Sequence, residues 1–343
     1  MVPDPPALDT DRLAAWMTQH VPGFRGPLSA TKFKGGQSNP TYRLDAPSGT
    51  LVLRRKPAGE LLASAHAVDR EFRVLQALHG RGVPVAEPVA LCADDSVIGS
   101  MFYLMGFVEG RIFWDPALPE VAVGARAAYY AEVVRVLAAV HAVDPAAAGL
   151  ADYGKPGSYF SRQIARWTAQ YRAAETMRID AMEHLLAWLP AHCPPDDGCS
   201  ALVHGDFRID NLIFHPTEPR VLAVVDWELS TLGHPLADLA YFCMALRLPR
   251  NPAIPGLAGM DRDALGIPSE EALLARYAEA TGRSRVPDWN FCLAFNFFRL
   301  AAIAQGVLKR AEQGNASSEQ AQSVGRMARL VAEAGAAMTT GTP

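Results

Sequence analysis

The sequence predicts an α+β fold of two lobes, in which a small antiparallel β lobe with one helix precedes a larger, mostly helical lobe. Its 343 residues exceed what one compact core usually holds. The first third alternates strand-like segments with turns, whereas alanine-rich helical segments dominate from about residue 117. We therefore place the N-terminal lobe, including an N-terminal helix, at residues 1–108 and the C-terminal lobe at residues 109–343, and we expect a cleft between them.

The strands of the first lobe are predicted by short apolar stretches that end at turn residues. "SATKFKGG" (29–36) runs into a glycine turn, "PTYRL" (40–44) leads to "APSG", and "TLVLRRKP" (50–57) ends at a proline. "MFYLMGFVEG" (101–110) is a further buried strand that ends at a glycine. This succession is typical of antiparallel strands joined by tight turns.

The helices are predicted by apolar residues at helical spacing. In residues 64–82, Val68, Phe72, Leu75 and Leu78 repeat every three or four positions, and the segment ends at a glycine. The second lobe contains long alanine-rich helices, such as those expected in residues 126–143 and 161–177.

Composition and charge exclude several classes of protein. The formal net charge is −4 and half of the residues are hydrophobic, so neither nucleic acid nor an anionic membrane is an expected partner. The long apolar run from Phe291 is interrupted by Asn296, Arg299 and Gln305. We expect a buried core helix there rather than a membrane span.

The cysteines and the N-terminus indicate a cytoplasmic protein. Five cysteines without a C-x-x-C pair fit reduced thiols, which we interpret as small buried hydrophobic residues. The first residues, "MVPDPPALDTDRLAAWM", carry prolines and aspartates instead of the basic start and apolar run of a signal peptide.

Polar residues are crowded into "LVHGDFRIDNLIFHP", between two apolar stretches. His204, Asp206, Arg208 and Asn211 have the spacing H-x-D-x-x-x-x-N of a kinase catalytic loop. A second apolar strand, "VLAVV", is followed directly by Asp226. Together these segments supply a carboxylate base and two oxygen ligands of the kind that Mg²⁺ prefers. An isolated H-x-D would indicate a structural turn, so the prediction of phosphoryl transfer depends on the combination.

Longer segments resemble the aminoglycoside phosphotransferase and choline kinase superfamily, small-molecule kinases with a protein-kinase-like fold. The segments are "FKGGQSNPTYRL", "SAHAVDREFRVL" and "VHGDFRIDNLIFHPTEPRVLAVVDWELSTLGHPLADLAY", and the resemblance covers roughly residues 28–313. More narrowly, they are similar to the phosphotransferase domain that some organisms fuse to an acyl-CoA dehydrogenase. The resemblance implies an ATP- and Mg²⁺-dependent enzyme, with GTP as an alternative nucleotide.

The resemblance also implies roles for individual residues of the second lobe. Asp206 is expected to be the catalytic base, Asn211 and Asp226 to be metal ligands, and His204 to shape the loop. Asp238 matches the aspartate that braces this loop from a helix.

Four further residues near this loop receive their own interpretations. Arg208 is expected near the transferred phosphoryl group, and we interpret Asp210 as a loop-capping carboxylate. Trp227 is expected to pack beneath Asp226, whereas Glu228 is either a metal or substrate ligand or a surface carboxylate.

The nucleotide is expected to bind the first lobe. Gly35, Gly36, Gln37 and Ser38 are candidates for a loop over the phosphates, although Gly-Gly is also common in hairpin turns. Backbone groups from Met105 to Val108 would meet the adenine.

The family's phosphate-binding lysine position falls on Arg54. Lys56 lies two residues on and therefore on the same strand face, so both remain candidates for the phosphate contact. Glu71 matches the helix carboxylate that holds this cation; the alternative is a solvated helix charge.

Three functional classes follow from these patterns. A protein kinase is disfavoured because only 12 positions separate Asp226 from Asp238, too few for an activation segment. A small-molecule kinase is favoured, and a catalytically silent protein of the same fold is the alternative because Arg54 departs from the family pattern.

The acceptor is expected to be a small-molecule alcohol. The sequence from Tyr241 onward contains eleven basic and nine acidic residues. This slight positive excess favours a neutral or anionic alcohol over a polycationic aminoglycoside antibiotic. The resemblance suggests a hydroxyacyl-CoA or another hydroxyacid derivative, and a functional association with an acyl-CoA dehydrogenase. The oligomeric state stays open.

Overall fold

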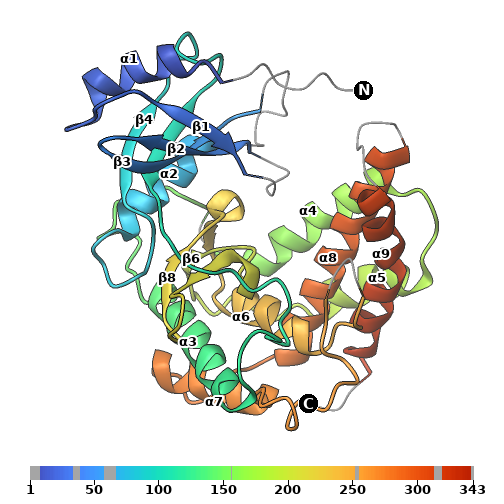
Figure 1. Cartoon of the computed structure of the whole chain (residues 1–343). Helices are drawn as coiled ribbons and strands as arrows, with labels where there is room; N and C mark the ends of the chain where they lie inside the picture. Colours follow the sequence, from blue (N-terminus) through green and yellow to red (C-terminus); the bar gives the residue numbers. More distant parts are fainter. Residues whose placement is uncertain are drawn as a thin grey trace.

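A computed structural model of the chain describes residues 8–33, 39–57, 67–155, 157–251, 255–312 and 319–340. It has two lobes, a small one built on a sheet and a larger helical one (Figure 1). The predicted α+β architecture, with the β lobe first, is confirmed. The phosphate-loop candidates Gly35, Gly36, Gln37 and Ser38 lie outside the described residues.

The small lobe contains an antiparallel five-stranded sheet in the order β1-β2-β3-β5-β4. Its strands are β1 (Ser29–Lys32), β2 (Thr41–Ala46), β3 (Gly49–Arg55), β4 (Pro88–Cys92) and β5 (Phe102–Gly106). The four strands expected from the sequence are confirmed as β1, β2, β3 and β5, whereas β4 was not predicted.

The two faces of this sheet belong to different hydrophobic cores. Helix α1 (Thr10–His20) lies against one face, where Phe102 and Leu104 of β5 pack in a core with α1 residues such as Leu13. Tyr103, between them on β5, points to the other face and joins the core of the large lobe. This alternation is the period of two that a strand imposes on its side chains.

Helix α2 (Val68–Leu78) follows β3 in sequence but packs into the large lobe's core. Its buried residues Phe72 and Leu75 belong to that core, and the Phe72 ring lies 5.7 Å from the Tyr103 ring. The helix expected within residues 64–82 is thus confirmed, and it connects the sheet to the large lobe.

The large lobe consists of helices around two short two-stranded antiparallel sheets (Figure 1). Its helices are α3 (Val123–His141), α4 (Tyr159–Ala174), α5 (Asp180–Ala191), α6 (Leu236–Cys243), α7 (Glu270–Thr281), α8 (Trp289–Glu312) and α9 (Glu319–Ala337). The sheets pair β6 (Ala201–Val203) with β9 (Thr231–Gly233) and β7 (Leu212–Phe214) with β8 (Val221–Val224). Single 3₁₀ turns at Ile209–Asn211 and Trp227–Leu229 follow β6 and β8.

Helix α8 is long and apolar enough to cross a membrane, but 78% of its most apolar window is buried inside the fold. Asn296, fully buried, donates to the carbonyl oxygens of Ala237 (2.9 Å) and Cys292 (3.1 Å) and so ties α8 to α6. Arg299 lies over the rings of Trp167 and Tyr241. The prediction of a core helix is confirmed, since most of its apolar window is buried within the large lobe.

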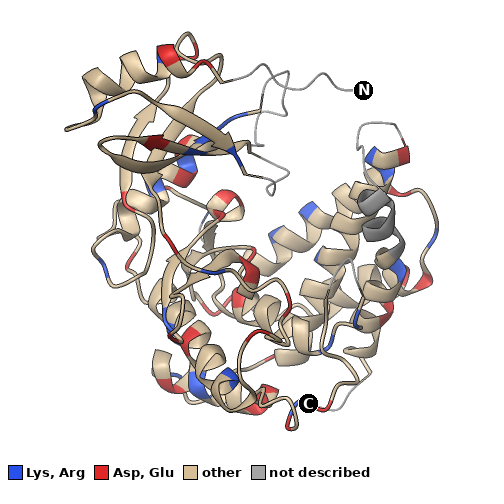
Figure 2. Cartoon of the chain, in the orientation of Figure 1, with Lys and Arg blue, Asp and Glu red and all other residues tan. Residues whose placement is uncertain are grey.

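The cysteines match the expectation only in part. All five are free thiols; Cys92, Cys243 and Cys292 are buried, whereas Cys193 and Cys199 are partly exposed. The interpretation of Cys193 and Cys199 as buried hydrophobic residues was wrong, because they lie in the irregular segment between α5 and β6. Basic and acidic residues are interspersed over both lobes (Figure 2).

Candidate active site

The loop after β6 is held by one buried carboxylate. Asp238 on α6 is 1% exposed and accepts the backbone N–H groups of His204 (2.5 Å) and Gly205 (2.9 Å). Burial opposes the ionised form of Asp238, but hydrogen bonds from His141 and the Gly205 N–H, with the electrostatic influence of the two neighbouring imidazoles, lower its pKa overall. His141 lies 3.4 Å from the same carboxylate. Asp238 therefore occupies the bracing position that the resemblance implied.

His204 connects this loop to the segment that follows β8. Its Nδ1 accepts the Asp206 N–H (3.2 Å), so its Nε2 carries the proton and donates to the Val225 carbonyl oxygen (2.9 Å). The side chain is completely buried. His204 thereby fixes the backbone of the loop and holds the residue that precedes Asp226.

Gly205 allows the loop to approach the turn after β8. Its φ is +84°, and a Cβ at this position would lie 2.5 Å from the Leu229 carbonyl oxygen. Arg299 of α8 donates to the Gly205 carbonyl oxygen from the other side. A larger residue would require the two segments to separate.

Asp206 is oriented by two neighbours from its own loop. Asn211 donates from Nδ2 to the Asp206 carboxylate (3.1 Å) and to its carbonyl oxygen (2.8 Å). The Arg208 Nε lies 3.2 Å from the other carboxylate oxygen of Asp206. The H-x-D-x-x-x-x-N spacing thus brings its polar side chains together around one carboxylate.

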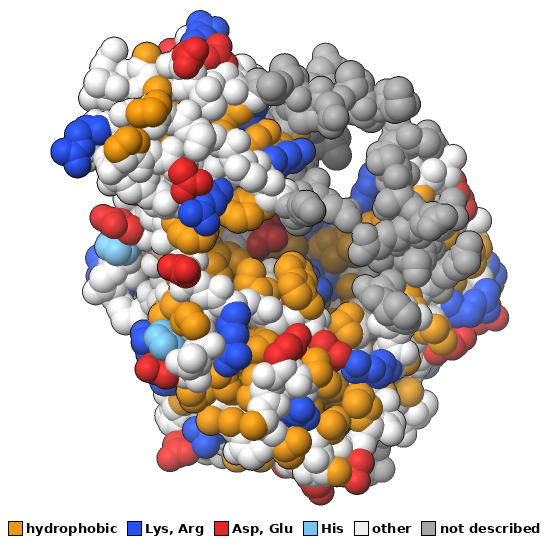
Figure 3. Space-filling model, in the orientation of Figure 1, with side chains coloured by type: hydrophobic (Ala, Val, Ile, Leu, Met, Phe, Trp, Pro, Cys, Tyr) orange, Lys and Arg blue, Asp and Glu red, His pale blue; other side chains and the backbone are white. Residues whose placement is uncertain are grey.

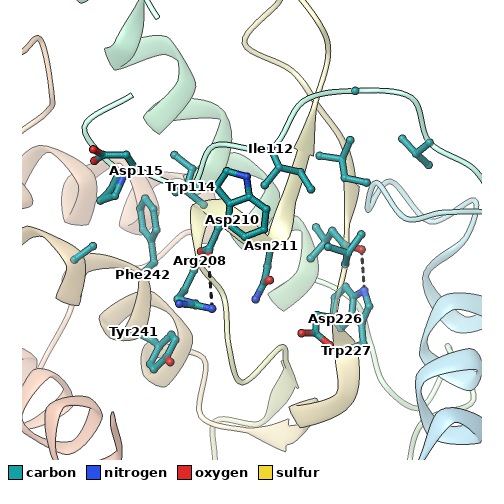
Figure 4. A pocket seen from close by; sticks show the side chains of 18 of the residues that line it. Ile112, Trp114, Asp115, Arg208, Asp210, Asn211, Asp226, Trp227, Tyr241 and Phe242 are labelled. Carbon is teal, nitrogen blue, oxygen red and sulfur yellow. Dashed lines mark hydrogen bonds and ion pairs between the residues drawn. The ribbon is translucent and has the colours of Figure 1, made fainter. Parts of the chain in front are cut away.

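Asp210 forms an ion pair with Arg208 of the same loop. The distance from Arg208 Nη2 to Asp210 Oδ2 is 3.3 Å, and both residues are seen in Figure 4. Burial is the largest effect on the Asp210 carboxyl and raises its pKa, which Arg208 opposes. In turn, the carboxylates of Asp206 and Asp210 outweigh burial and raise the pKa of Arg208.

Asp226 directs its carboxylate toward the small lobe from a left-handed backbone conformation (φ 67°, ψ 60°). Such a conformation costs a non-glycine residue on the order of 1 kcal/mol and is concentrated at functional sites. The next residue, Trp227, is 2% exposed, donates to the Val224 carbonyl oxygen (3.0 Å) and lies 4.6 Å from the His204 ring. Trp227 therefore packs in the loop core next to Asp226.

Arg54 of β3 reaches the carboxylates of both lobes. Its Nε lies 2.8 Å from Glu71 Oε2, at ion-pair distance without hydrogen-bond alignment, and its Nη2 lies 2.5 Å from Asp226 Oδ1. Glu228 is 3.4 Å from the same Nη2. Lys56 lies just beyond the end of β3. Arg54, at the family's lysine position, is the cation that meets both lobes' carboxylates.

Glu71 is buried, not a solvated helix charge. Its side chain is 2% exposed and accepts from Asn39 Nδ2 (2.8 Å) and from the Tyr103 hydroxyl (3.2 Å). The pKa of Glu71 is raised to about 7. Burial is the largest cause, Asp226 and Glu228 act in the same direction, and Arg54 opposes them. The alternative reading of Glu71 as a surface charge was wrong because α2 faces the core.

Glu228 also belongs to the group of carboxylates around Arg54, so it is not a plain surface carboxylate. It is 21% exposed, pairs with Arg54 and accepts from Asn39 Nδ2 at 3.4 Å. The sequence alone did not identify Asn39 or Tyr103. Asn39 ends the predicted glycine loop, and that position was the one available signal.

These residues border a cavity of about 1380 Å³ between the lobes. Arg54, Met105 and Val108 line it from the small lobe, and Arg208, Asp210, Asn211 and Asp226 from the large lobe. Figure 3 shows the hollow, with hydrophobic side chains on its walls. Asp206 lies against Arg208 and Asn211, and Glu71 lies behind Arg54. Most predicted candidates from the described residues of both lobes therefore line this cavity, whereas His204, Asp206 and Glu71 lie behind its lining.

The outer part of the cavity is mainly apolar. Trp114 is 67% exposed at this side, with Ile112 and Phe242 nearby (Figure 4). Asp115 and Arg250 form an ion pair there (2.5 Å). Among the described lining residues, three arginines (Arg54, Arg208 and Arg250) balance three aspartates (Asp115, Asp210 and Asp226).

Comparisons with known proteins agree with this geometry. A model of the "Phosphotransferase enzyme family" matches residues 29–292. Mouse acyl-CoA dehydrogenase family member 10 is 50% identical over 309 residues, which are 90% of this chain and 29% of that protein. Human acyl-CoA dehydrogenase family member 11 is 44% identical over 333 residues, 95% of this chain and 42% of that protein. The chain thus spans less than half the length of these relatives.

Solved structures show the same fold. A crystal structure of a protein from Ralstonia eutropha, assigned as an aminoglycoside phosphotransferase, has a TM-score of 0.88 and 53% identity, covering 96% of this chain and 98% of that one. A spectinomycin phosphotransferase in complex with ADP and spectinomycin has a TM-score of 0.65 at 12% identity, covering 97% and 99%. The expected kinase-like fold is confirmed, and the family match over residues 29–292 shows that the chain belongs to the phosphotransferase enzyme family.

Proposed function

We propose that this protein transfers the γ-phosphoryl group of ATP, with Mg²⁺, to the hydroxyl of a small molecule. The observation that supports the proposal is that Arg54 of the small lobe forms ion pairs with Glu71 and with Asp226 of the large lobe. Asp206 and its loop lie next to this group. Phosphoryl transfer requires a positioned base and fixed charges around the phosphates rather than covalent chemistry. GTP remains an alternative nucleotide.

Asp206 is the proposed base. Its carboxylate is 18% exposed, with Asn211 on one oxygen and Arg208 on the other, and each carboxylate oxygen has a further lone pair that can accept the proton of an acceptor hydroxyl. His204 and Asp238 hold the backbone on which Asp206 lies. Arg208, whose side chain is 44% exposed, supplies positive charge next to the position of the transferred group.

Asp226 and Asn211 are the proposed metal ligands. Three carboxylates (Glu71, Asp226 and Glu228) surround the single guanidinium of Arg54, and Asp226 is 35% exposed toward the cavity. This excess of hard oxygen donors fits Mg²⁺. A bound Mg²⁺ would neutralise charge on the nucleotide oxygens. Arg54 holds Asp226 in place and adds positive charge near the phosphates.

The adenine is proposed to bind at the end of β5. Met105 and Val108 line the cavity beside the apolar side chains of Val52 and Leu75. Apolar walls with nearby backbone groups are typical of sites for planar bases. Gly35, Gly36, Gln37 and Ser38 remain the proposed loop over the phosphates.

The acceptor is proposed to be a hydroxyacyl-CoA or another hydroxyacid derivative. The apolar outer cavity, with balanced charges, suits a neutral or anionic molecule better than a polycation. The similarity to acyl-CoA dehydrogenase family members also supports an acceptor related to acyl-CoA and a functional association with such a dehydrogenase. An aminoglycoside-type acceptor is the second candidate, supported by the assignment of the Ralstonia eutropha protein.

The substitution Asp206→Asn tests the base. It preserves size and most hydrogen bonds but removes the proton acceptor, so turnover should fall by about 10²-fold or more while ATP binding stays nearly unchanged. Steady-state kinetics and calorimetric ATP titration would measure the two effects. Turnover within a few-fold of the wild type would remove Asp206 from this role.

The substitution Asp226→Ala tests the metal site. It should abolish the increase in ATP affinity that Mg²⁺ provides, because the exposed carboxylate beside Arg54 is lost. Asp210→Ala is the matched control, since Asp210 lines the same cavity but pairs with Arg208. The reverse ranking of the two variants in ATP titrations with and without Mg²⁺ would show that the wrong carboxylate was assigned.

A panel of acceptors tests the substrate class. The protein is incubated with ATP, Mg²⁺ and hydroxyacyl-CoAs, aminoglycosides, choline or homoserine, and mass spectrometry follows the gain of one phosphoryl group. The apolar, charge-balanced outer cavity predicts phosphorylation of a hydroxyacyl-CoA. Phosphorylated kanamycin beside untouched hydroxyacyl-CoAs would instead establish the antibiotic-modifying activity.

A further inference from the structure

A short segment of the large lobe, residues 149–154, holds helix α2 from outside the cavity. Arg73 of α2 donates to the Gly149 carbonyl oxygen (2.6 Å) and pairs with Asp152. Arg70 donates to the Tyr153 carbonyl oxygen (2.7 Å), and its guanidinium lies 3.9 Å from the centre of the Tyr153 ring. The helix that carries Glu71 is therefore fastened to the large lobe by the residue preceding Glu71 and by Arg73.

The hydroxyl of Tyr153 reaches the turn on the other side of the ion-pair group. It lies 2.8 Å from Ser230 Oγ, and the Ser230 hydroxyl donates to the Trp227 carbonyl oxygen (2.5 Å). Because Ser230 uses its proton on Trp227, the Tyr153 proton is directed to Ser230, with the Arg70 carbonyl oxygen (3.3 Å) as a weaker second acceptor. One phenol thus touches the backbone next to Glu71 and the turn that follows Asp226.

The segment also packs closely on the strand after this turn. A Cβ on Gly154 would lie 2.6 Å from the Leu232 backbone nitrogen and 2.6 Å from Thr231 Oγ1. Tyr153 itself is 1% exposed and Ser230 is 4% exposed. In a buried, closely packed contact of this kind, a lost hydrogen bond leaves its partner unsatisfied, so the geometry is held tightly.

We propose that Tyr153 is a positioning residue that sets the separation of Glu71 from Asp226, and through it the orientation of Arg54. This role of Tyr153 rests on the proposed function, because the quantity that it changes is the affinity for a magnesium-bound nucleotide. Arg54 pairs with Glu71 on α2 and with Asp226 before the Trp227–Leu229 turn. Tyr153 is hydrogen-bonded to the same two segments, so a shift of either segment changes both ion pairs of Arg54.

This connection explains how the chain holds its ion pairs without a long segment after Asp226. Only 12 positions separate Asp226 from Asp238, and these include the turn and β9. The bonds of Arg70, Arg73 and Tyr153 instead hold α2 directly on the large lobe.

The test is the conservative substitution Tyr153→Phe, which keeps the ring under Arg70 and removes only the hydroxyl. Calorimetry measures the affinity for AMP-PNP with MgCl₂ and with EDTA, and hydrogen exchange follows the backbone amides of residues 70–72 and 226–230. Tyr171→Phe is the matched control, because Tyr171 is a fully buried phenol on α4 whose hydroxyl is bonded to neither Arg70 nor Ser230. Ser230→Ala removes the same bond from the other side and replaces Tyr153→Phe if that variant does not fold.

We expect Tyr153→Phe to weaken AMP-PNP binding about threefold to tenfold in MgCl₂ and less than about twofold in EDTA, the loss expected for one buried hydrogen bond. Exchange should rise in both segments, and Tyr171→Phe should show neither change. An unchanged increment of affinity from Mg²⁺ in Tyr153→Phe overturns the proposal. A wild-type protein that binds no AMP-PNP contradicts the proposed function instead, and hydrogen exchange alone then decides whether Tyr153 connects the two segments.

Discussion

The contact of Arg54 with Glu71 and Asp226 is the interaction on which the candidate site depends. One guanidinium from the small lobe joins a carboxylate on α2 to a carboxylate after β8, at 2.8 and 2.5 Å. Such buried pairs contribute little net stability, since desolvation offsets their attraction, but breaking one leaves an uncompensated charge. Their role here is geometric, because they set how the sheet, α2 and the loop that carries Asp206 face the cavity. The raised pKa of Glu71, about 7, reflects burial beside two further carboxylates.

The large lobe supplies a rigid base for this contact. Asp238 accepts two successive backbone N–H groups, His204 joins the loop to Val225, and Arg299 of α8 donates to Gly205. Each of these groups is buried and hydrogen-bonded, so the loop has little freedom to move. The Asp226 carboxylate is thereby presented from a fixed backbone toward a cavity that is polar at its centre and apolar at its outer end, and the Asp206 carboxylate is held next to the lining residues Arg208 and Asn211.

The loop side of the site could be predicted from the sequence, because its polar residues interrupt two apolar strands at a distinctive spacing. From His204 to Asp226 they lie close in the chain, so local pattern and position coincide. The roles of Asn39, Tyr103 and Tyr153 were not predicted, since each meets partners more than thirty positions away and only Asn39, at the end of the predicted glycine loop, has a distinctive local context. The ion pair of Asp210 with Arg208 could not be predicted, because the sequence does not show that Arg208 turns toward it. In the fold, β4 was missed because Pro88 opens a strand with little alternation.

The proposed site for a magnesium-bound nucleotide depends on Arg54 rather than on Lys56, and affinity measurements on Arg54 variants test this dependence. Calorimetric titration of AMP-PNP in MgCl₂ would compare Arg54→Met, Arg54→Lys and Lys56→Met with the wild type. We expect Arg54→Met to weaken binding by about tenfold or more, because Glu71, Asp226 and Glu228 are left without their cation. Arg54→Lys should retain part of the affinity through its charge, and Lys56→Met should bind like the wild type. Wild-type affinity in Arg54→Met, or a larger loss in Lys56→Met, would show that Arg54 does not have this role.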